Sequence, residues 1–333
     1  MPTRVRSHAK VNLGLAIGPP REDGFHALAT IYQTLAVHDW VEVTATAAAT
    51  GGVRITCSDG RVPCDARNTC WRAVELALDR LNLTAQVHIH IEKNLPMQGG
   101  LGAGSANAAA ALLGLERELR RPLRGSDRLA IAAETGSDVP LFLIGGTVLG
   151  LGRGEEVYPL PDLPPLPCVV AIPDTGVSTP QAFRDWDRLQ ASLGLTGAAG
   201  FDRLKQLGRE WAAALSSPGS HIAKATGVFP AKDRAGNLLL ELVRAGIEND
   251  FEQVVFPQYP SLRDILEILK TPSAGANAAV YAALSGSGSA LFGLYPAAAD
   301  AAVIATRLRQ AGITALETTL LPRATYWAEA VEA

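Results

Sequence analysis

A glycine-rich stretch between residues 95 and 107 is the part of this sequence best suited to bind a charged ligand. It reads Leu-Pro-Met-Gln-Gly-Gly-Leu-Gly-Ala-Gly-Ser-Ala-Asn and runs directly into the alanine-rich segment 108–115. Glycines let the backbone approach an anion closely and adopt positive φ, and the free N–H groups and dipole of a following helix favour negative charge. The stretch therefore predicts a cradle for the phosphates of a polyphosphate ligand.

Two common nucleotide-binding loops do not fit this stretch. No Gly-Lys-Ser/Thr closes it, as a P-loop requires, and no glycine stands three residues after Gly104 to complete a dinucleotide fingerprint. A flexible glycine turn before a helix is the alternative interpretation.

A strand near the N-terminus carries polar residues that could act on a ligand. Period-2 alternation places apolar residues on one face of this strand. The opposite, polar face carries His8, Lys10, Asn12 and Gly14. We expect the apolar face to be buried and the polar face to line a cleft. A solvated lysine on an edge strand is the alternative.

The use of lysine supports a role for this strand. The chain has six lysines among its 30 basic residues, and Lys10 and Lys93 are the only two in the first 200 positions. Both lie beside the segments described above. This usage favours a compact ammonium group at the two positions, in a chain that otherwise uses arginine.

Composition limits the remaining possibilities. A length of 333 residues, 47% hydrophobic residues and a net charge of −3 are typical of a globular protein with one or two domains. Near-neutral charge argues against nucleic acid as the main partner, and no apolar stretch reaches membrane-spanning length or forms a signal peptide. We therefore expect a cytoplasmic protein that acts on small molecules, without a membrane, nucleic-acid or obligate protein partner.

The cysteines and histidines give no metal site. Cys57, Cys64, Cys70 and Cys168 contain no Cys-x-x-Cys pair and are expected to be reduced thiols. His88 and His90 alternate with apolar residues, which indicates a solvated strand face rather than a metal pair.

The rest of the chain alternates strands and helices. We expect strands at 41–46, 53–57, 86–92, 141–151, 168–172 and 290–294, and helices at 68–81, 105–119, 126–134, 180–190, 237–245, 261–270 and 299–310. The proline-rich segment 159–167 predicts a boundary between domains 1–160 and 161–333. Segment 193–235 has weak periodicity and receives no assignment.

Three motifs in this order resemble the GHMP kinases: the Lys10 strand, the loop at 96–107, and Ser285-Gly286-Ser287-Gly288. Further segments are most similar to the branch of that family that phosphorylates 4-diphosphocytidyl-2-C-methyl-D-erythritol: 9–13, 23–26, 136–140, 178–180 with Phe183, and 249–252. The resemblance implies an α+β, two-domain GHMP-kinase fold. Its N-terminal half would be like domain 2 of ribosomal protein S5, and its C-terminal half would be ferredoxin-like.

The resemblance also implies an activity: transfer of a phosphoryl group from ATP to the C2 hydroxyl of that substrate, in non-mevalonate isoprenoid biosynthesis. Asp138 matches the catalytic aspartate of the family, and Lys10 would lie near it and keep it ionised. Mg²⁺ would bridge phosphate oxygens, with Ser105 as the one protein ligand suggested. A turn aspartate after a helix is the alternative for Asp138.

The same resemblance assigns binding residues. ATP would be bound by Asn68, Lys93, Pro96, Met97, Gln98, Gly99, Gly100, Leu101, Gly102, Ala103, Gly104, Ser105, Ala106 and Asn107. Its adenine would lie near Asn68, Lys93 and Asn107. The substrate would be bound by Asn12, Phe25, His26, Tyr32, Thr179, Phe183, Ser285 and Gly286.

Within the substrate set, cytosine would stack between Phe25 and Phe183, with His26 on its edge, and methylerythritol would lie near Asn12, Tyr32 and Thr179. Core packing is the alternative for the two phenylalanines. Two rival functions stay open: a kinase of the same family for another small alcohol, such as homoserine or a sugar, and a non-catalytic sensor of the same fold.

Overall fold

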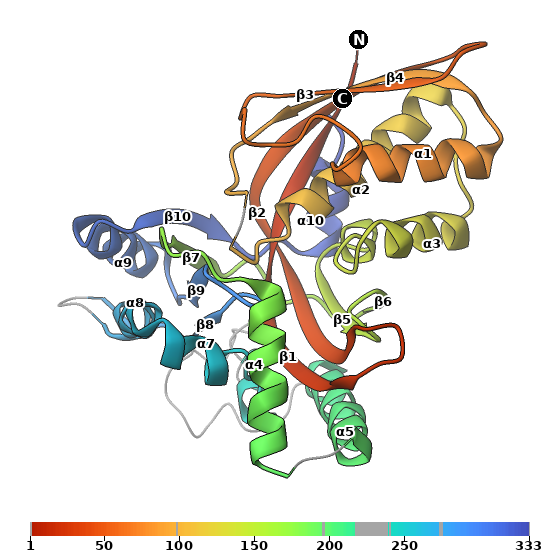
Figure 1. Cartoon of the computed structure of the whole chain (residues 1–333). Helices are drawn as coiled ribbons and strands as arrows, with labels where there is room; N and C mark the ends of the chain where they lie inside the picture. The colour runs from red at the N-terminus through yellow and green to blue at the C-terminus, as the bar shows by residue number, and fades with distance from the viewer. Residues whose placement is uncertain are drawn as a thin grey trace.

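The protein is built on two sheets that follow one another along the chain (Figure 1). This computed structural model describes residues 2–97, 99–194, 197–216, 239, 241–272 and 276–332. The first sheet has the strand order β3-β4-β2-β5-β6, with β1 paired to β2, and the second has the order β10-β7-β9-β8. Both sheets carry helices, so the expected α+β class is confirmed.

Two long antiparallel strands form the centre of the first half. They are β1 (Thr3–Pro20) and β2 (His26–Ala47). Shorter strands extend this sheet: β3 (Gly52–Cys57), β4 (Ala85–Glu92), β5 (Thr147–Leu151) and β6 (Glu156–Pro159). The helices of this half are α1 (Thr69–Leu81), α2 (Ala103–Leu119) and α3 (Gly125–Thr135).

Helix α2 packs closely on β2 because its buried face consists mostly of small residues. Ala108 to Ala111 are all buried, and at Gly114 an added Cβ would lie 2.6 Å from Val43. This close packing fixes the N-terminus of α2, and with it the glycine-rich loop, relative to β1 and β2.

The second sheet has the ferredoxin-like order that the resemblance implied. Its strands are β7 (Pro167–Ile172), β8 (Tyr281–Leu284), β9 (Leu291–Leu294) and β10 (Thr314–Thr319), all antiparallel. Numbered in chain order, their spatial order is 4-1-3-2, as in a split β-α-β-β-α-β unit. The helices here are α4 (Thr179–Ser192), α5 (Gly197–Ser216), α7 (Glu252–Gln258), α8 (Pro260–Lys270) and α9 (Ala298–Gln310).

The last helix, α10 (Arg323–Glu329), returns to the first half. The Tyr326 hydroxyl donates to the carbonyl of Phe142, and Val331 bridges Val5, so that the two chain ends lie close together (Figure 1). The strands of the first sheet end at Pro159 and those of the second begin at Pro167. The division into domains 1–160 and 161–333 stays a prediction. Helix α10 belongs to the second of these ranges but contacts the first.

Several expected elements differ from the structure. Segment 141–151 was expected as one strand, but it forms a 3₁₀ turn, η1 (Pro140–Leu143), followed by β5, because Gly145 and Gly146 both adopt φ +72 between them. Helix α2 begins at Ala103 rather than 105. The helix expected at 237–245 lies partly outside the described residues, as does much of segment 193–235.

Candidate functional site

The polar residues of β1 lie inside the protein rather than on an open cleft wall. Residues 7–18 are buried on both faces of the strand, and β1 has irregularities in its pairing between His8 and Lys10 and between Asn12 and Gly14. His8 points to a different environment from Lys10, in contact with the rings of His38 and Tyr326. The expected simple alternation is therefore wrong here, because helices and strands cover both faces.

Lys10 and Asp138 form an ion pair at the centre of the site. The Lys10 Nζ lies 3.3 Å from Asp138 Oδ2, and it donates to Asn12 Oδ1 at 2.6 Å. The Lys10 side chain is 3% exposed and that of Asp138 is 32% exposed. The buried ammonium thus supports a carboxylate that still reaches solvent.

Tyr32 of β2 supplies a second donor to the same carboxylate. Its hydroxyl donates to Asp138 Oδ1 at 3.0 Å. Burial, and next the charge of Asp138, raise the pKa of Tyr32 well above its ordinary value. Tyr32 therefore stays protonated at neutral pH and acts as a hydrogen-bond donor, which leaves Asp138 as the group able to accept a proton from a ligand.

The glycine-rich loop takes the conformation that its composition predicted at three of its four glycines. Gly99, Gly100 and Gly102 have φ of +115, +80 and +71. At Gly100 an added Cβ would lie 2.1 Å from the carbonyl oxygen of Ser285, and at Gly102 it would lie 3.0 Å from Lys10 and Phe142. Gly104 does not share this feature, because it lies within α2 and an added Cβ would come no nearer than 3.8 Å, to Thr69 Oγ1.

The 285–288 loop completes the convergence of the three motifs. The Ser285 hydroxyl donates to the carbonyl of Gly100 at 3.0 Å, and Ala290 N–H donates to that of Gly99 at 3.1 Å. A Cβ at Gly286 would lie 3.4 Å from Asn12 Oδ1 and 3.7 Å from Lys10 Nζ. Segments some 275 residues apart in sequence thus meet around one ammonium group.

A polar cavity of about 620 Å³ opens beside these loops. It is lined by Gly99, Gly100, Gly176, Val177, Ser178, Thr179, Ser287 and Gly288. Thr179 and Ser287 share a hydroxyl hydrogen bond of 2.7 Å on its wall. Backbone N–H groups and hydroxyls can satisfy the oxygens of a phosphorylated ligand.

Asp39 organises the base of the glycine loop and was missed in the sequence analysis. Its fully buried carboxylate forms an ion pair with Lys93 and accepts the N–H groups of Asn94 at 2.7 Å and Leu95 at 2.8 Å. With its amide oriented to satisfy the surrounding groups, Asn107 also donates to Asp39, at 3.1 Å. Asp39 lies in strand β2, which also carries Glu42 and several other polar residues, so the sequence alone gives no signal that distinguishes it.

The three residues predicted near adenine are therefore engaged with the protein itself. Asn68 caps α1 by accepting Cys70 N–H and donates to the carbonyl of Pro63, while Lys93 and Asn107 bind Asp39. All three are nearly buried, so contacts of their side-chain polar groups with adenine stay a prediction. Gln98 lies outside the described residues.

The residues predicted to hold cytosine form two contacts instead of one clamp. His26 stacks on Phe183 with ring centroids 4.6 Å apart, and its Nε2 lies 2.7 Å from Asp187 Oδ1. Phe25 is 48% exposed and lies under the Arg153 guanidinium at 4.8 Å. The order Phe25, base, Phe183 is thus not prearranged, since His26 occupies one face of Phe183.

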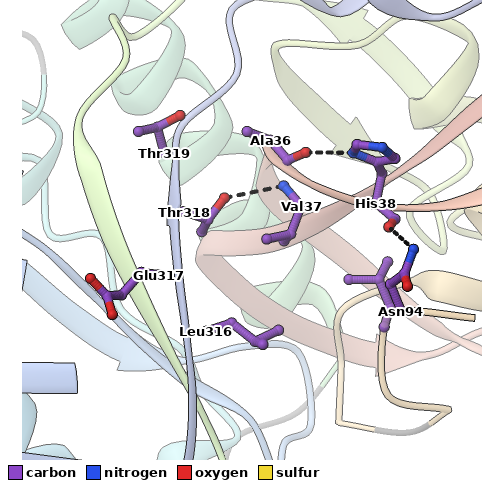
Figure 2. Close-up of a pocket in the computed structure, with 9 residues that line it drawn as sticks. Ala36, Val37, His38, Asn94, Leu316, Glu317, Thr318 and Thr319 are labelled. Atoms are coloured by element: carbon purple, nitrogen blue, oxygen red, sulfur yellow. Dashed lines mark hydrogen bonds between the residues drawn. The ribbon is translucent and has the colours of Figure 1, made fainter. Parts of the chain in front are cut away.

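A larger cavity, of about 640 Å³, lies away from this chemistry. Figure 2 shows it between residues 36–38 of β2, Asn94, and residues 316–319 of β10, where Val37 N–H donates to the Thr318 hydroxyl and Asn94 donates to the carbonyl of His38. It contains none of the predicted site residues. The hydrogen bond between Val37 and Thr318 joins β2 of the first half to β10 of the second.

The described ranges contain no cluster of three or more histidine, cysteine, aspartate or glutamate side chains arranged to hold a metal ion. Within the same part of the chain, no helix combines the length and apolar character needed to cross a bilayer.

Comparison with known proteins points to one family. Residues 68–146 match the model of the GHMP kinases N terminal domain, and residues 231–314 match that of the GHMP kinases C terminal domain. The chain is 36% identical to a 4-diphosphocytidyl-2-C-methyl-D-erythritol kinase of Solibacter usitatus, covering 87% of this chain and 80% of the relative. It is also 36% identical to the enzyme of that name from Streptomyces coelicolor, covering 94% of each.

The solved structures that match this chain include kinases named for different substrates. A crystal structure of 4-(cytidine 5'-diphospho)-2C-methyl-D-erythritol kinase matches with a TM-score of 0.66 and 28% identity, over 95% of this chain and 98% of that one. A homoserine kinase from Cytophaga hutchinsonii matches with a TM-score of 0.65 but 20% identity, over 96% and 95%. The fold is thus shared across substrates, and sequence similarity distinguishes them.

Proposed function

The chain belongs to the GHMP kinases, and within them to the 4-diphosphocytidyl-2-C-methyl-D-erythritol kinases, and from this membership we propose how its own residues carry out the reaction. The enzyme transfers a phosphoryl group from ATP, its co-substrate, to the C2 hydroxyl of that small molecule, in isoprenoid biosynthesis. The convergence of the Lys10–Asp138 pair with the two glycine-containing loops is the observation that supports this proposal.

Asp138 acts as the base for the substrate hydroxyl. Both of its oxygens are held by protonated donors, Lys10 Nζ and the Tyr32 hydroxyl, yet about a third of the side chain is exposed to an incoming ligand. A positioned carboxylate of this kind accepts the hydroxyl proton as the bond to phosphorus forms. Lys10 compensates the negative charge that gathers around the transferred group.

The glycine loop and the N-terminus of α2 bind the phosphates of ATP. Left-handed glycines at 99, 100 and 102 turn the backbone so that its N–H groups and the free N–H groups of α2 can face an anion. Asp39 fixes both ends of this loop through Asn94, Leu95 and Asn107. The loop is therefore preorganised, which lowers the entropy lost on binding.

Mg²⁺ fits the donors around this loop only as an ion bound mainly by phosphate and water. Magnesium commonly keeps several waters and takes one or two protein ligands beside substrate phosphates. Ser105, half-buried in the first turn of α2, would supply a hydroxyl ligand, and the ion would neutralise phosphate charge.

The cytidine end of the substrate lies at Phe25, His26 and Phe183. The stacked His26 and Phe183 rings and the exposed Phe25 ring provide aromatic faces, and the hydrogen bond that His26 Nε2 donates to the Asp187 carboxylate fixes the orientation of His26. Base binding requires His26 or Phe25 to change its contacts. Methylerythritol lies toward Asn12, Tyr32 and Thr179, with Ser285 and Gly286 beside it.

The reaction takes place in the cytoplasm on this proposal. All four cysteines are free, as in a reducing compartment, and burial raises the pKa of Cys70 to about 12, which keeps that thiol inert.

One assay distinguishes the proposed function from its rivals. ADP formation is measured for the purified enzyme with 4-diphosphocytidyl-2-C-methyl-D-erythritol, with methylerythritol 4-phosphate lacking the cytidylyl group, and with homoserine. We expect turnover of the first compound and very poor turnover of the other two, because binding energy at the cytidine end orients the reacting hydroxyl. Equal turnover of the truncated compound would indicate a kinase for another alcohol, and binding without turnover would indicate a sensor.

A further inference from the structure

Residues 248–250 connect the catalytic strand to the second half of the protein. The Leu15 N–H donates to the carbonyl of Glu248 at 2.8 Å, and the Asp250 N–H donates to the carbonyl of Leu15 at 2.9 Å, as a short parallel bridge between Leu15 and Asn249. Strand β1 also carries Lys10 and Asn12. Segment 248–250 is therefore fixed to the backbone that positions these two residues.

Asn249 holds the 285–288 loop in place. Its buried amide donates to the carbonyls of Leu284 at 2.8 Å and Gly286 at 2.7 Å, while its oxygen accepts Phe251 N–H. Gly286 lies beside the Lys10 ammonium and the Asn12 amide oxygen, which an added Cβ would approach to 3.7 and 3.4 Å. The distance between the loop and the Lys10 ammonium thus depends on the position of Asn249.

Asp250 connects the same segment to α5. One carboxylate oxygen accepts both Ile17 N–H and Arg203 Nη1 at 2.7 Å, and the other accepts Arg203 Nη2 at 2.8 Å. Asp250 is 1% exposed, so its charge depends on this bidentate pair. The pKa of Arg203 is raised, first by its hydrogen bonds to Asp250.

Helix α5 itself docks on β1 near the same residues. Trp211 is 1% exposed, and its ring lies 3.3 Å from where a Cβ would stand at Gly14, while Leu204 fills the space beside Gly18. Sequence patterns predicted no role for this helix. Its charged contact with Asp250 and its apolar contacts at Gly14 and Gly18 hold α5 against the strand that carries Lys10 and Asn12.

We propose that Arg203 is a positioning residue for phosphoryl transfer and acts through Asp250 and Asn249 on Gly286. The inference rests on the proposed function. Without Arg203, the buried Asp250 carboxylate keeps one hydrogen-bond donor among the residues that the structure describes, the backbone N–H of Ile17. The most direct relief is movement of segment 249–250 toward water. That movement carries the two amide hydrogen bonds of Asn249, so the 285–288 loop shifts away from Lys10. A misplacement of about 1 Å at reacting groups can cost on the order of 100-fold in rate.

The kinetic test compares three variants on one helix. Arg203→Gln should lower kcat by about 10- to 100-fold, with the KM for ATP changed less than about threefold. Arg203→Lys keeps the charge and should recover much of the loss, whereas Arg209→Gln, an exposed arginine on the same helix, should match the wild type. Loss of kcat only in proportion to the folded fraction, measured by denaturation, would overturn the proposal.

Two further measurements identify the route. In the double variant Arg203→Gln/Asp250→Asn, kcat should equal that of Asp250→Asn alone, because the two residues act in one chain; additive losses would overturn the proposed route. Hydrogen exchange of peptides covering 284–290 in the ligand-free enzyme should be faster in Arg203→Gln than in Arg209→Gln, and unchanged exchange there would refute the coupling. This readout needs no turnover, so a wild-type enzyme inactive on the cytidylyl substrate would refute the proposed function and leave this test decisive for the inference.

Discussion

Replacement of Gly104 by alanine separates a phosphate cradle from an ordinary glycine turn. Gly104 is the second residue of α2, its φ lies outside the left-handed region, and an added Cβ meets no protein atom closer than 3.8 Å. Alanine therefore introduces no strain in the free protein. Because glycine within a helix is less favourable than alanine by about 0.5–1 kcal/mol, Gly104→Ala should raise the free energy of unfolding by up to that amount.

ATP binding should change in the opposite direction. If phosphate oxygens approach the first turn of α2 closely, the added methyl group occupies their space, and the N–H group of residue 104 can no longer reach them. We expect ATP affinity to fall at least about tenfold, which corresponds to about 1.4 kcal/mol. A more stable protein that binds its co-substrate less tightly is a combination that a purely structural turn cannot produce.

The assay combines urea denaturation of the free protein with calorimetric titration of a non-hydrolysable ATP analogue. Gly125→Ala is the matched control, since Gly125 opens α3 and an added Cβ there meets nothing within 4 Å. It should change stability without changing affinity. If Gly104→Ala bound the analogue as tightly as the wild type, no phosphate would lie against Gly104, and the cradle would have to end at Gly102.

The remaining predictions concern the base, the cytidine end and pH. Asp138→Asn should lower turnover by about 10²- to 10⁴-fold while calorimetry still detects ATP binding, and near-normal turnover would exclude Asp138 as the base. Phe183→Ala should raise the substrate KM about 5- to 150-fold without altering ATP affinity, with Phe183→Leu as a control that keeps an apolar contact to Phe251; equal KM values for the alanine variant and the wild type would remove Phe183 from the base site. Burial, and next the neighbouring His38, lower the pKa of His8 to about 3. Since the unfolded chain takes up this proton near pH 6.5 and the folded protein does not, stability falls as pH drops below about 6.5, by about 2 kcal/mol between pH 7 and 5. Urea denaturation at both pH values should show a smaller fall in His8→Asn, and an equal fall would contradict the neutral, buried state of His8.

Local composition was sufficient to predict much of the chemistry. The glycine loop preceding α2 is encoded by neighbouring residues, because backbone freedom at glycine is a short-range property. The local pattern also identified the strand with Lys10, but not the burial of both its faces. The motif order was sufficient to predict the family and the α+β class, which the matching family models and the sheet topology confirm. The roles of Lys10 and Asp138 stay predictions that the 3.3 Å ion pair supports.

Tertiary structure decided what those residues contact. Local sequence could not show that the Asp39 carboxylate would bind Lys93, Asn94 and Leu95. Nor could it show that His26 would cover one face of Phe183. Each of these contacts joins segments more than 50 residues apart. The same holds for Gly286, which Asn249 places beside Lys10. The sequence determined which local conformations and chemical groups are available, whereas long-range packing determined which groups meet, because burial of a charge or amide is satisfied only by partners that the complete fold brings together.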